Sequence, residues 1–272
     1  VNAHYVDEEN PNKVNKTGID AMLASLDPYT NYIPEDDIED FRTQSTGQYG
    51  GIGALTSRIE GKIRITMVFE GYSAQKNGLK IGDEVLKIDD VDVTNLSRSE
   101  GMVTEDIGYV KLTEFIIDAG KDVRYAVVKL KNEGAEKIIL DVRGNPGGLL
   151  MEAVNITNVF LPKGKEVVST KGKISDNNQM YKTLNQPVDT DIPLVVLINS
   201  GSASASEIVA GTLQDYDRAV IVGNKSFGKG LVQITRPLTY NSQLKVTTAK
   251  YYTPSGRCIQ ALDYSHRNED GS

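Results

Sequence analysis

Residues 193–233 are PLVVLINSGSASASEIVAGTLQDYDRAVIVGNKSFGKGLVQ, and this stretch decides the fold. Its first aliphatic run predicts a strand at Leu194–Ile198 that is covered on both faces. A tight turn of small residues follows, then a helix that begins at Ser206-Glu207 and a second apolar strand at Ala219–Val222. The turn brings hydroxyl groups to a helix N-terminus, where free backbone N–H groups favour developing negative charge. One short unit therefore supplies a candidate nucleophile and a site for an anion.

The residues before this unit follow a similar pattern. We predict a strand at Gly108–Leu112, an amphipathic helix at 113–131 and a buried strand at Lys137–Asp141. A strand, helix and strand at this spacing imply a crossover connection and a mainly parallel sheet. A glycine-rich turn and another apolar helix come next, over 141–160. The sequence therefore predicts an α/β fold whose mainly parallel core occupies residues 101–272.

Composition excludes several classes of function. The 272 residues carry a net charge of −7 and no basic stripe, which argues against a nucleic-acid partner. No apolar run approaches the roughly 18 residues of a membrane-spanning helix. Cys258 is the only cysteine, and the two histidines, His4 and His266, lie at opposite ends of the chain. We therefore expect no metal or other cofactor, and a serine hydrolase here needs a base other than histidine.

Two segments precede the predicted core. Residues 1–42 predict an N-terminal helical segment, and the acidic residues within 29–41 are expected on a solvated helix face. Residues 43–100 contain a glycine-rich loop, an alternating strand at 62–68, a short helix closed by Gly78 and a further strand. This second segment resembles a PDZ domain. In that family the backbone N–H groups of the loop bind the terminal carboxylate of a peptide. The positions that match the loop are Gly50, Gly51, Ile52 and Gly53. The alternative is a glycine hairpin that binds no ligand.

The match to a PDZ domain is incomplete. Such a domain needs about another helix and two strands after Val93, but Ser99-Glu100 continues directly into Gly101. Either the domain is shortened, or a stretch is missing between Glu100 and Gly101. We favour the second explanation, because a half-sheet with an open edge is a poor folding unit.

The turn after the first strand offers three candidate nucleophiles. Ser202, Ser204 and Ser206 alternate with alanine, so small residues surround every hydroxyl. Ser206 is the natural helix cap, which places Ser204 in the accessible part of the turn. The N–H of Ala205 then points at a developing oxyanion.

The candidate base is a lysine between two glycines. Lys229 acts as a base near neutral pH only in a desolvated pocket, for which Phe227 and Leu231-Val232 are candidate walls. Gln233 can hold the amine by a hydrogen bond without adding charge.

A second glycine turn offers another anion site. Residues 141–148, DVRGNPGG, join a predicted strand to a predicted helix. Consecutive glycines let the backbone approach a ligand and direct N–H groups at it. The alternative is an ordinary turn.

Three motifs, SASASEI at 202–208, FGKGLVQ at 227–233 and DVRGNPGG at 141–148, stand behind a PDZ-like segment. Together they resemble the carboxy-terminal processing peptidases, or tail-specific proteases. The resemblance implies that Ser204 is the nucleophile, Lys229 the general base and Gln233 the residue that orients the base. It also implies oxyanion donors at Ala205 and at Gly147 or Gly148, substrates with free C-termini, and an extracytoplasmic location in the periplasm or cell envelope.

Two other functions remain as alternatives. The chain could be a catalytically silent peptide-binding scaffold. Residues 223–229 also fit the G-x-x-x-x-G-K pattern of a phosphate-binding loop. Against a nucleotide site, Gly230 lacks the hydroxyl that ligates magnesium, and a β-like run at 231–235 follows instead of a helix.

Overall fold

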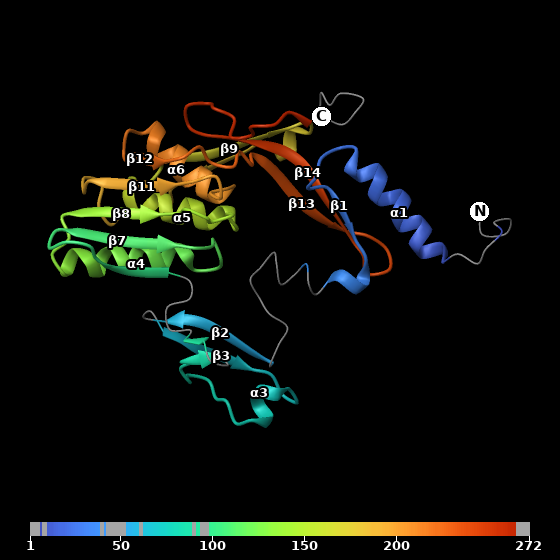
Figure 1. Ribbon diagram of the computed structural model, residues 1–272, viewed down its shortest axis with the longest axis horizontal. Coiled ribbons are helices and arrows are strands. Elements are labelled where there is room, and N and C mark those ends of the chain that lie inside the picture. Colours follow the sequence, from blue (N-terminus) through green and yellow to red (C-terminus); the bar gives the residue numbers. More distant parts are fainter. Residues whose placement is uncertain are drawn as a thin grey trace.

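A computed structural model describes residues 10–38, 53–59, 62–88, 91–92 and 98–264, together with Val6 and Phe41. Its central sheet has the strand order β12-β11-β8-β7-β6 (Figure 1). These strands are Val220–Gly223, Leu194–Ile198, Lys137–Asp141, Ile107–Leu112 and Arg98–Met102. The first four are mutually parallel, and β6 is antiparallel to β7. The predicted α/β core with a mainly parallel sheet is therefore confirmed.

Three helices pack against one another beside this sheet. They are α4 (Ala119–Asn132), α5 (Leu150–Phe160) and α6 (Ala205–Asp215). Strand β9 (Glu166–Gly172), from a second sheet, packs against α5 and α6. The buried aliphatic residues of all these elements form one cluster, in which Val123, Val127 and Leu130 recur at helical spacing along α4. The hydrophobic core therefore lies around these helices, between the central sheet and the second sheet.

The second sheet is antiparallel and only partly anticipated by the sequence. Its order is β1-β14-β9-β10, with β13 also paired to β14. Its other members are β1 (Asn31–Ile33), β10 (Gln179–Lys182), β13 (Leu231–Pro237) and β14 (Gln243–Tyr252), and a 3-10 turn at Ser175–Asn177 precedes β10. Figure 1 shows β13 and β14 extending toward β1 and α1 (Pro11–Ala24). The sheet therefore joins the N-terminal segment to residues near the other end of the chain.

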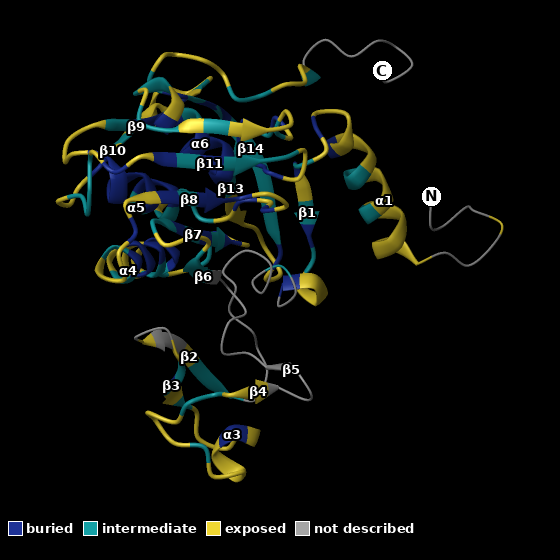
Figure 2. Cartoon of the chain, turned by 60° about the vertical axis from the view of Figure 1, so that its left-hand side comes forward, coloured by how far each residue is buried: buried dark blue, intermediate teal, exposed yellow. Residues whose placement is uncertain are grey.

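The N-terminal segment differs from the prediction. Among the described residues of this segment, Pro11–Ala24 is α-helical, and Ile38 and Phe41 also have helical backbone. Asn31–Ile33 forms β1 and Glu35–Asp37 forms a 3-10 turn, where the prediction was a continuous helix. Leu23 is the buried residue of α1, and Figure 2 shows the rest of that helix largely exposed. Pairing of β1 with β14 overrides the local helical pattern, because it satisfies backbone groups of both strands.

The long helix of the core also begins later than predicted. The sequence pattern indicated a helix from Thr113, but α4 starts at Ala119, after Asp118 with a φ of 69°. The backbone of Phe115 bonds to the glycine turn instead: its N–H donates to Gly147 O, and its carbonyl accepts from Leu149 N–H. A tertiary contact therefore holds this segment extended.

The PDZ-like segment is small. It consists of β2 (Ala54–Ile59), β3 (Lys62–Val68), α3 (Ser73–Lys76), β4 (Lys87–Ile88) and β5 (Val91–Asp92). Ile65 and Ala74 are its buried apolar residues among those described, and Figure 2 shows how much of it is exposed. Gly50, Gly51 and Ile52 lie outside the described residues. Glu100 and Gly101 are adjacent within β6, which pairs with β7 in the central sheet, so this strand crosses the expected domain boundary.

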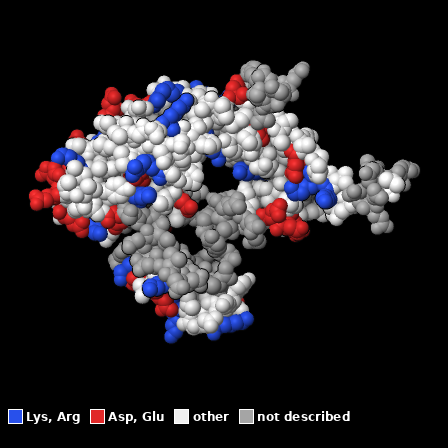
Figure 3. Space-filling view, in the orientation of Figure 1, with Lys and Arg blue, Asp and Glu red and all other residues white. Residues whose placement is uncertain are grey.

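Basic and acidic side chains are interspersed on the face shown in Figure 3. None of the helices in the described ranges has the length and hydropathy needed to cross a membrane.

Candidate active site

Ser204 lies at the turn between β11 and α6. Helix α6 begins at Ala205, so Ser204 and not Ser206 occupies the cap position. Its φ of 54° and ψ of −111° are strained for a residue with a side chain. Such strain clusters at functional sites, because it is retained only where the surroundings enforce it.

The two flanking serines have structural hydrogen bonds. The Ser202 hydroxyl donates to Val142 O at 2.8 Å, and the Ser206 hydroxyl donates to Asn145 O at 3.0 Å. Both serines are fully buried, at 0% exposure, whereas Ser204 is only partly buried. The structure therefore distinguishes three serines that the sequence presents as similar, and Ser204 is the accessible one.

The glycine turn after β8 packs directly on Ser204. A Cβ built at Gly147 would lie 2.8 Å from Ser204 Cβ and 2.9 Å from Ala205 N. One built at Gly148 would lie 2.4 Å from Phe115 O, and both glycines have positive φ. Glycine is required at both positions, because any side chain would displace the turn.

The two glycines differ in the use of their N–H groups. Gly147 N–H donates to the Asn145 side chain at 2.9 Å. Within the described part of the chain, no group accepts from the N–H of Gly148 or of Ala205. Ala205 and Gly148 therefore carry the unused donors beside Ser204.

Glu207 joins the serine turn to the lysine loop, and sequence reasoning missed this role. Its Oε2 accepts from Ser204 N–H at 2.8 Å and from Lys229 N–H at 2.9 Å, and its Oε1 accepts from Gly228 N–H at 2.6 Å. The carboxylate is 6% exposed. Because one oxygen binds both N–H groups, the backbones of Ser204 and Lys229 lie within two hydrogen-bond lengths of each other. The only sequence signal was an acidic residue in the first turn of a helix.

The amine of Lys229 lies over an aromatic ring from the N-terminal segment. Its Nζ is 4.9 Å from the centroid of Tyr29. Of the predicted walls, Phe227 is 57% exposed, whereas Leu231 is buried. Burial lowers the pKa of Lys229, the positive charge of Lys245 lowers it further, and Glu207 opposes both. No hydrogen bond joins the Ser204 hydroxyl to this amine among the described residues. Catalytic hydrogen bonds are often long in the absence of substrate.

Gln233 lies on β13, opposite Thr247 of β14, and its Nε2 donates to the Thr247 hydroxyl at 3.2 Å. Thr247 also contacts Thr30 of the N-terminal turn: Thr247 N–H donates to the Thr30 hydroxyl at 3.2 Å. The site thus combines residues from both ends of the chain, which no local motif reveals.

Asp141 and Arg143 of the glycine turn form a separate network. Arg143 Nε donates to Asp141 Oδ1 at 2.9 Å, and the Tyr109 hydroxyl donates to Asp141 Oδ2 at 2.6 Å. These contacts outweigh burial and lower the pKa of Asp141. They fix the end of β8 from which the turn departs.

The alternative chemistries gain no support from the described residues. Cys258 is exposed, both histidines are outside the described residues, and no cluster of metal-ligating side chains occurs within the described ranges. Gly53 belongs to the PDZ-like segment, where its φ of 77° lets Tyr72 pack on its backbone. The G-x-x-x-x-G-K pattern is followed by strand β13, so the helix of a phosphate loop is absent there.

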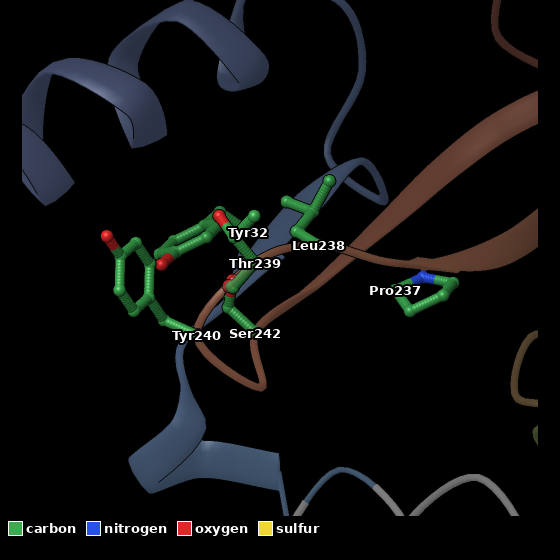
Figure 4. Close-up of a pocket in the computed structure, with 6 residues that line it drawn as sticks. All are labelled: Tyr32, Pro237, Leu238, Thr239, Tyr240 and Ser242. Carbon is green, nitrogen blue, oxygen red and sulfur yellow. The ribbon is translucent and has the colours of Figure 1, made fainter.

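Figure 4 shows a hollow of the described surface, about 620 Å³ in volume. It is lined by Tyr32, Pro237, Leu238, Thr239, Tyr240 and Ser242. This hollow lies at the end of β13 that is remote from Lys229. Its lining residues include no lysine, histidine or carboxylate that could activate a hydroxyl as a base.

Ser204 in a strained turn, the N–H groups of Ala205 and Gly148 that lack an acceptor among the described residues, and the partly buried Lys229 are groups that a serine peptidase could use. Residues 106–264 match peptidase family S41, and residues 42–103 match the PDZ domain. The chain therefore belongs to peptidase family S41, and it is a serine peptidase of the carboxy-terminal-processing type.

Individual relatives agree. A carboxy-terminal-processing protease of Bartonella bacilliformis is 34% identical over 307 residues, which cover 96% of this chain and 70% of that protein. A probable CtpA-like serine protease of Staphylococcus aureus is also 34% identical, over 95% of this chain and 60% of its own length. The chain thus spans between 60% and 70% of these curated relatives. A 307-residue alignment is longer than the 272-residue chain, so that relative contains segments without a counterpart here.

Solved structures give the same fold. The photosystem II D1 C-terminal processing protease superposes with a TM-score of 0.63 at 25% identity, over 95% of this chain and 82% of its own. A lipoprotein from Streptococcus agalactiae superposes with a TM-score of 0.57 at 12% identity, which concerns the fold alone.

Proposed function

We propose that this chain is an endopeptidase in which Ser204 is the nucleophile and Lys229 is the general base. Ser204 Oγ attacks the carbonyl carbon of a peptide bond while its proton passes to the neutral amine of Lys229. The N–H groups of Ala205 and Gly148 bind the oxyanion. The protonated amine then gives its proton to the leaving nitrogen as the C–N bond breaks, which leaves an acyl-enzyme.

Water completes the cycle. It attacks the acyl carbon, its proton passes to Lys229, and the proton returns to Ser204 Oγ when the acid product leaves. The Glu207 carboxylate is the observation that carries this proposal, because its Oε2 accepts from the backbone N–H groups of both proposed catalytic residues. The lowered pKa of Lys229 supports the role of base, since a neutral amine is needed.

Substitution of the two residues tests the proposal. Ser204→Ala and Lys229→Ala are expected to abolish cleavage of an unfolded protein with an apolar C-terminus, followed on a gel. Ser200→Ala and Lys225→Ala are matched controls, because both residues are exposed and lie in the same two loops. Retained cleavage by either of the first two purified variants would end the assignment. If the protein is instead an inactive scaffold, the parent protein will bind the substrate without cleaving it.

We also propose that the PDZ-like segment selects substrates by their free C-terminus. The match of residues 42–103 to the PDZ domain supports this, since such domains bind a terminal carboxylate through loop N–H groups. Two peptides that differ only in a free or an amidated C-terminus test it. Faster cleavage of the free acid is expected, and equal rates would contradict C-terminal selection.

The proposed location is extracytoplasmic, and membership of the carboxy-terminal-processing family is its only support. Fractionation of cells that produce the full-length protein tests it. Recovery in the cytoplasmic fraction alone would contradict it.

A further inference from the structure

Tyr29 contacts the proposed general base, although the two residues lie near opposite ends of the chain. Its ring centroid is 4.9 Å from Lys229 Nζ. The ring of Tyr264 lies edge-on to Tyr29 at a centroid distance of 6.2 Å. The amine therefore meets an aromatic wall supplied by the N-terminal segment and backed by a residue near the C-terminus.

The turn that carries Tyr29 is built to hold it in place. The buried carboxylate of Asp27 accepts from the N–H groups of Tyr29 and Thr30, both at 2.8 Å, and from the Thr30 hydroxyl at 2.9 Å. The Thr30 hydroxyl accepts from Thr247 N–H, and the Thr247 hydroxyl accepts from Gln233. Hydrogen bonds through Thr30 and Thr247 thus connect Asp27 to Gln233.

Tyr29 adds no negative charge at neutral pH. Burial, followed by the contact with Tyr264, raises the pKa of Tyr29 to about 12. The other charged groups that face Lys229 are Glu207 on α6 and Lys245 on β14, and they act in opposite directions. Asp27 lies under the turn and is occupied by its three hydrogen bonds. The ring therefore acts on the amine mainly by excluding water.

We propose that Tyr29 is a positioning residue of the active site, which covers the Lys229 amine so that it can serve as a base near neutral pH. The N-terminal turn 27–30 is then a part of the catalytic unit and not merely a connection to it. This inference rests on the proposed roles of Ser204 and Lys229.

Two effects of the ring oppose each other. The π face attracts an ammonium ion, which raises the pKa of the lysine by less than about one unit at a partly exposed site. Exclusion of water lowers the pKa of a lysine by as much as about 3–5 units at full burial. Desolvation is also the largest influence on Lys229 in this structure. Removal of the ring is therefore expected to make the amine more basic.

The test is the pH dependence of kcat/KM for the full chain with Tyr29→Ala, Tyr29→Phe and Thr30→Val. For Tyr29→Ala we expect the rising limb to move to higher pH, with a loss of about tenfold at pH 7 and a return to within about twofold of the parent on the alkaline plateau. Tyr29→Phe keeps the ring and should match the parent. Thr30→Val loosens the turn and should move the limb in the same direction, which keeps the test available if Tyr29→Ala does not fold.

Tyr32→Ala is the matched control, because Tyr32 lies on β1 of the same segment but lines the hollow of Figure 4. Its pH profile should keep the parent's shape. A rate for Tyr29→Ala that is lower by one factor at every pH, or an unchanged profile, would overturn the proposal, as would an equal shift in Tyr32→Ala. Activity retained by Lys229→Ala would instead overturn the proposed base itself, so the two failures are distinguishable.

Discussion

Replacement of Glu207 by glutamine tests how the site is held together. The carboxylate accepts three backbone N–H groups, from Ser204, Gly228 and Lys229, and it is 6% exposed. An amide has one oxygen in place of two. In its better orientation that oxygen keeps the Ser204 and Lys229 bonds, and the NH2 group then faces the N–H of Gly228. Two donors meet there, and one buried N–H loses its acceptor.

The expected cost follows from these contacts. A buried donor without an acceptor costs about 1–3 kcal/mol, and the two surviving bonds lose the strength that a charged acceptor gives. We therefore expect Glu207→Gln to lower the free energy of unfolding by about 2–4 kcal/mol, which for a chain of this size is a fall in Tm on the order of 5–10 °C. Displacement of Lys229 from Ser204 should reduce cleavage on the order of a hundredfold.

Thermal unfolding, hydrogen exchange and cleavage measure these effects. The amides of Gly228 and Lys229 should exchange faster in the variant, because their acceptor is weakened or lost. Glu136→Gln is the control, since Glu136 is exposed and its substitution should change stability by less than about 0.5 kcal/mol. A Glu207→Gln protein with the Tm, amide protection and cleavage rate of the parent would refute the reasoning.

Three further predictions concern the same site. Gly147→Ala should abolish cleavage, because its Cβ would lie 2.7 Å from Ala203 O at a φ of +99°. Gly144→Ala is the control and should remain active, because Gly144 has a φ of +72° but open space around it. Equal activity of the two variants would contradict the close approach at Gly147. Lys229→Met should unfold at a higher temperature than the parent at pH 7. Burial depresses the pKa of Lys229 in the folded protein below 10.5, so the charged lysine costs stability below that folded pKa. The gain in unfolding temperature should therefore vanish as the pH rises toward 10.5. Lys225→Met, at an exposed position of the same loop, is the control substitution. Ser206→Ala should lose about 1 kcal/mol by thermal unfolding and still cleave substrate, since its hydroxyl bonds Asn145 O and not the reacting atoms; complete loss of cleavage by a folded variant would contradict this.

The sequence by itself determined the bounds of several strands and the parallel character of the core. Strands β3, β8 and β11 have the bounds that the aliphatic runs predicted, because apolar periodicity over a few residues follows from the burial of one strand. The three motifs also identified the family, since each is a continuous stretch of chain. The antiparallel strands β9 and β10 escaped prediction, because their pairing depends on distant partners.

Only the tertiary structure showed that the hydroxyls of Ser202 and Ser206 are occupied by hydrogen bonds while Ser204 is accessible. It also separated Gly148 from Gly147, because the N–H of Gly147 donates to Asn145. It alone brought Glu207 to the lysine loop and Tyr29 to the amine. Local sequence specifies which residues are available to a site. Contacts between residues far apart in the chain decide which of them are free to react, because burial and hydrogen-bond satisfaction are properties of the whole fold.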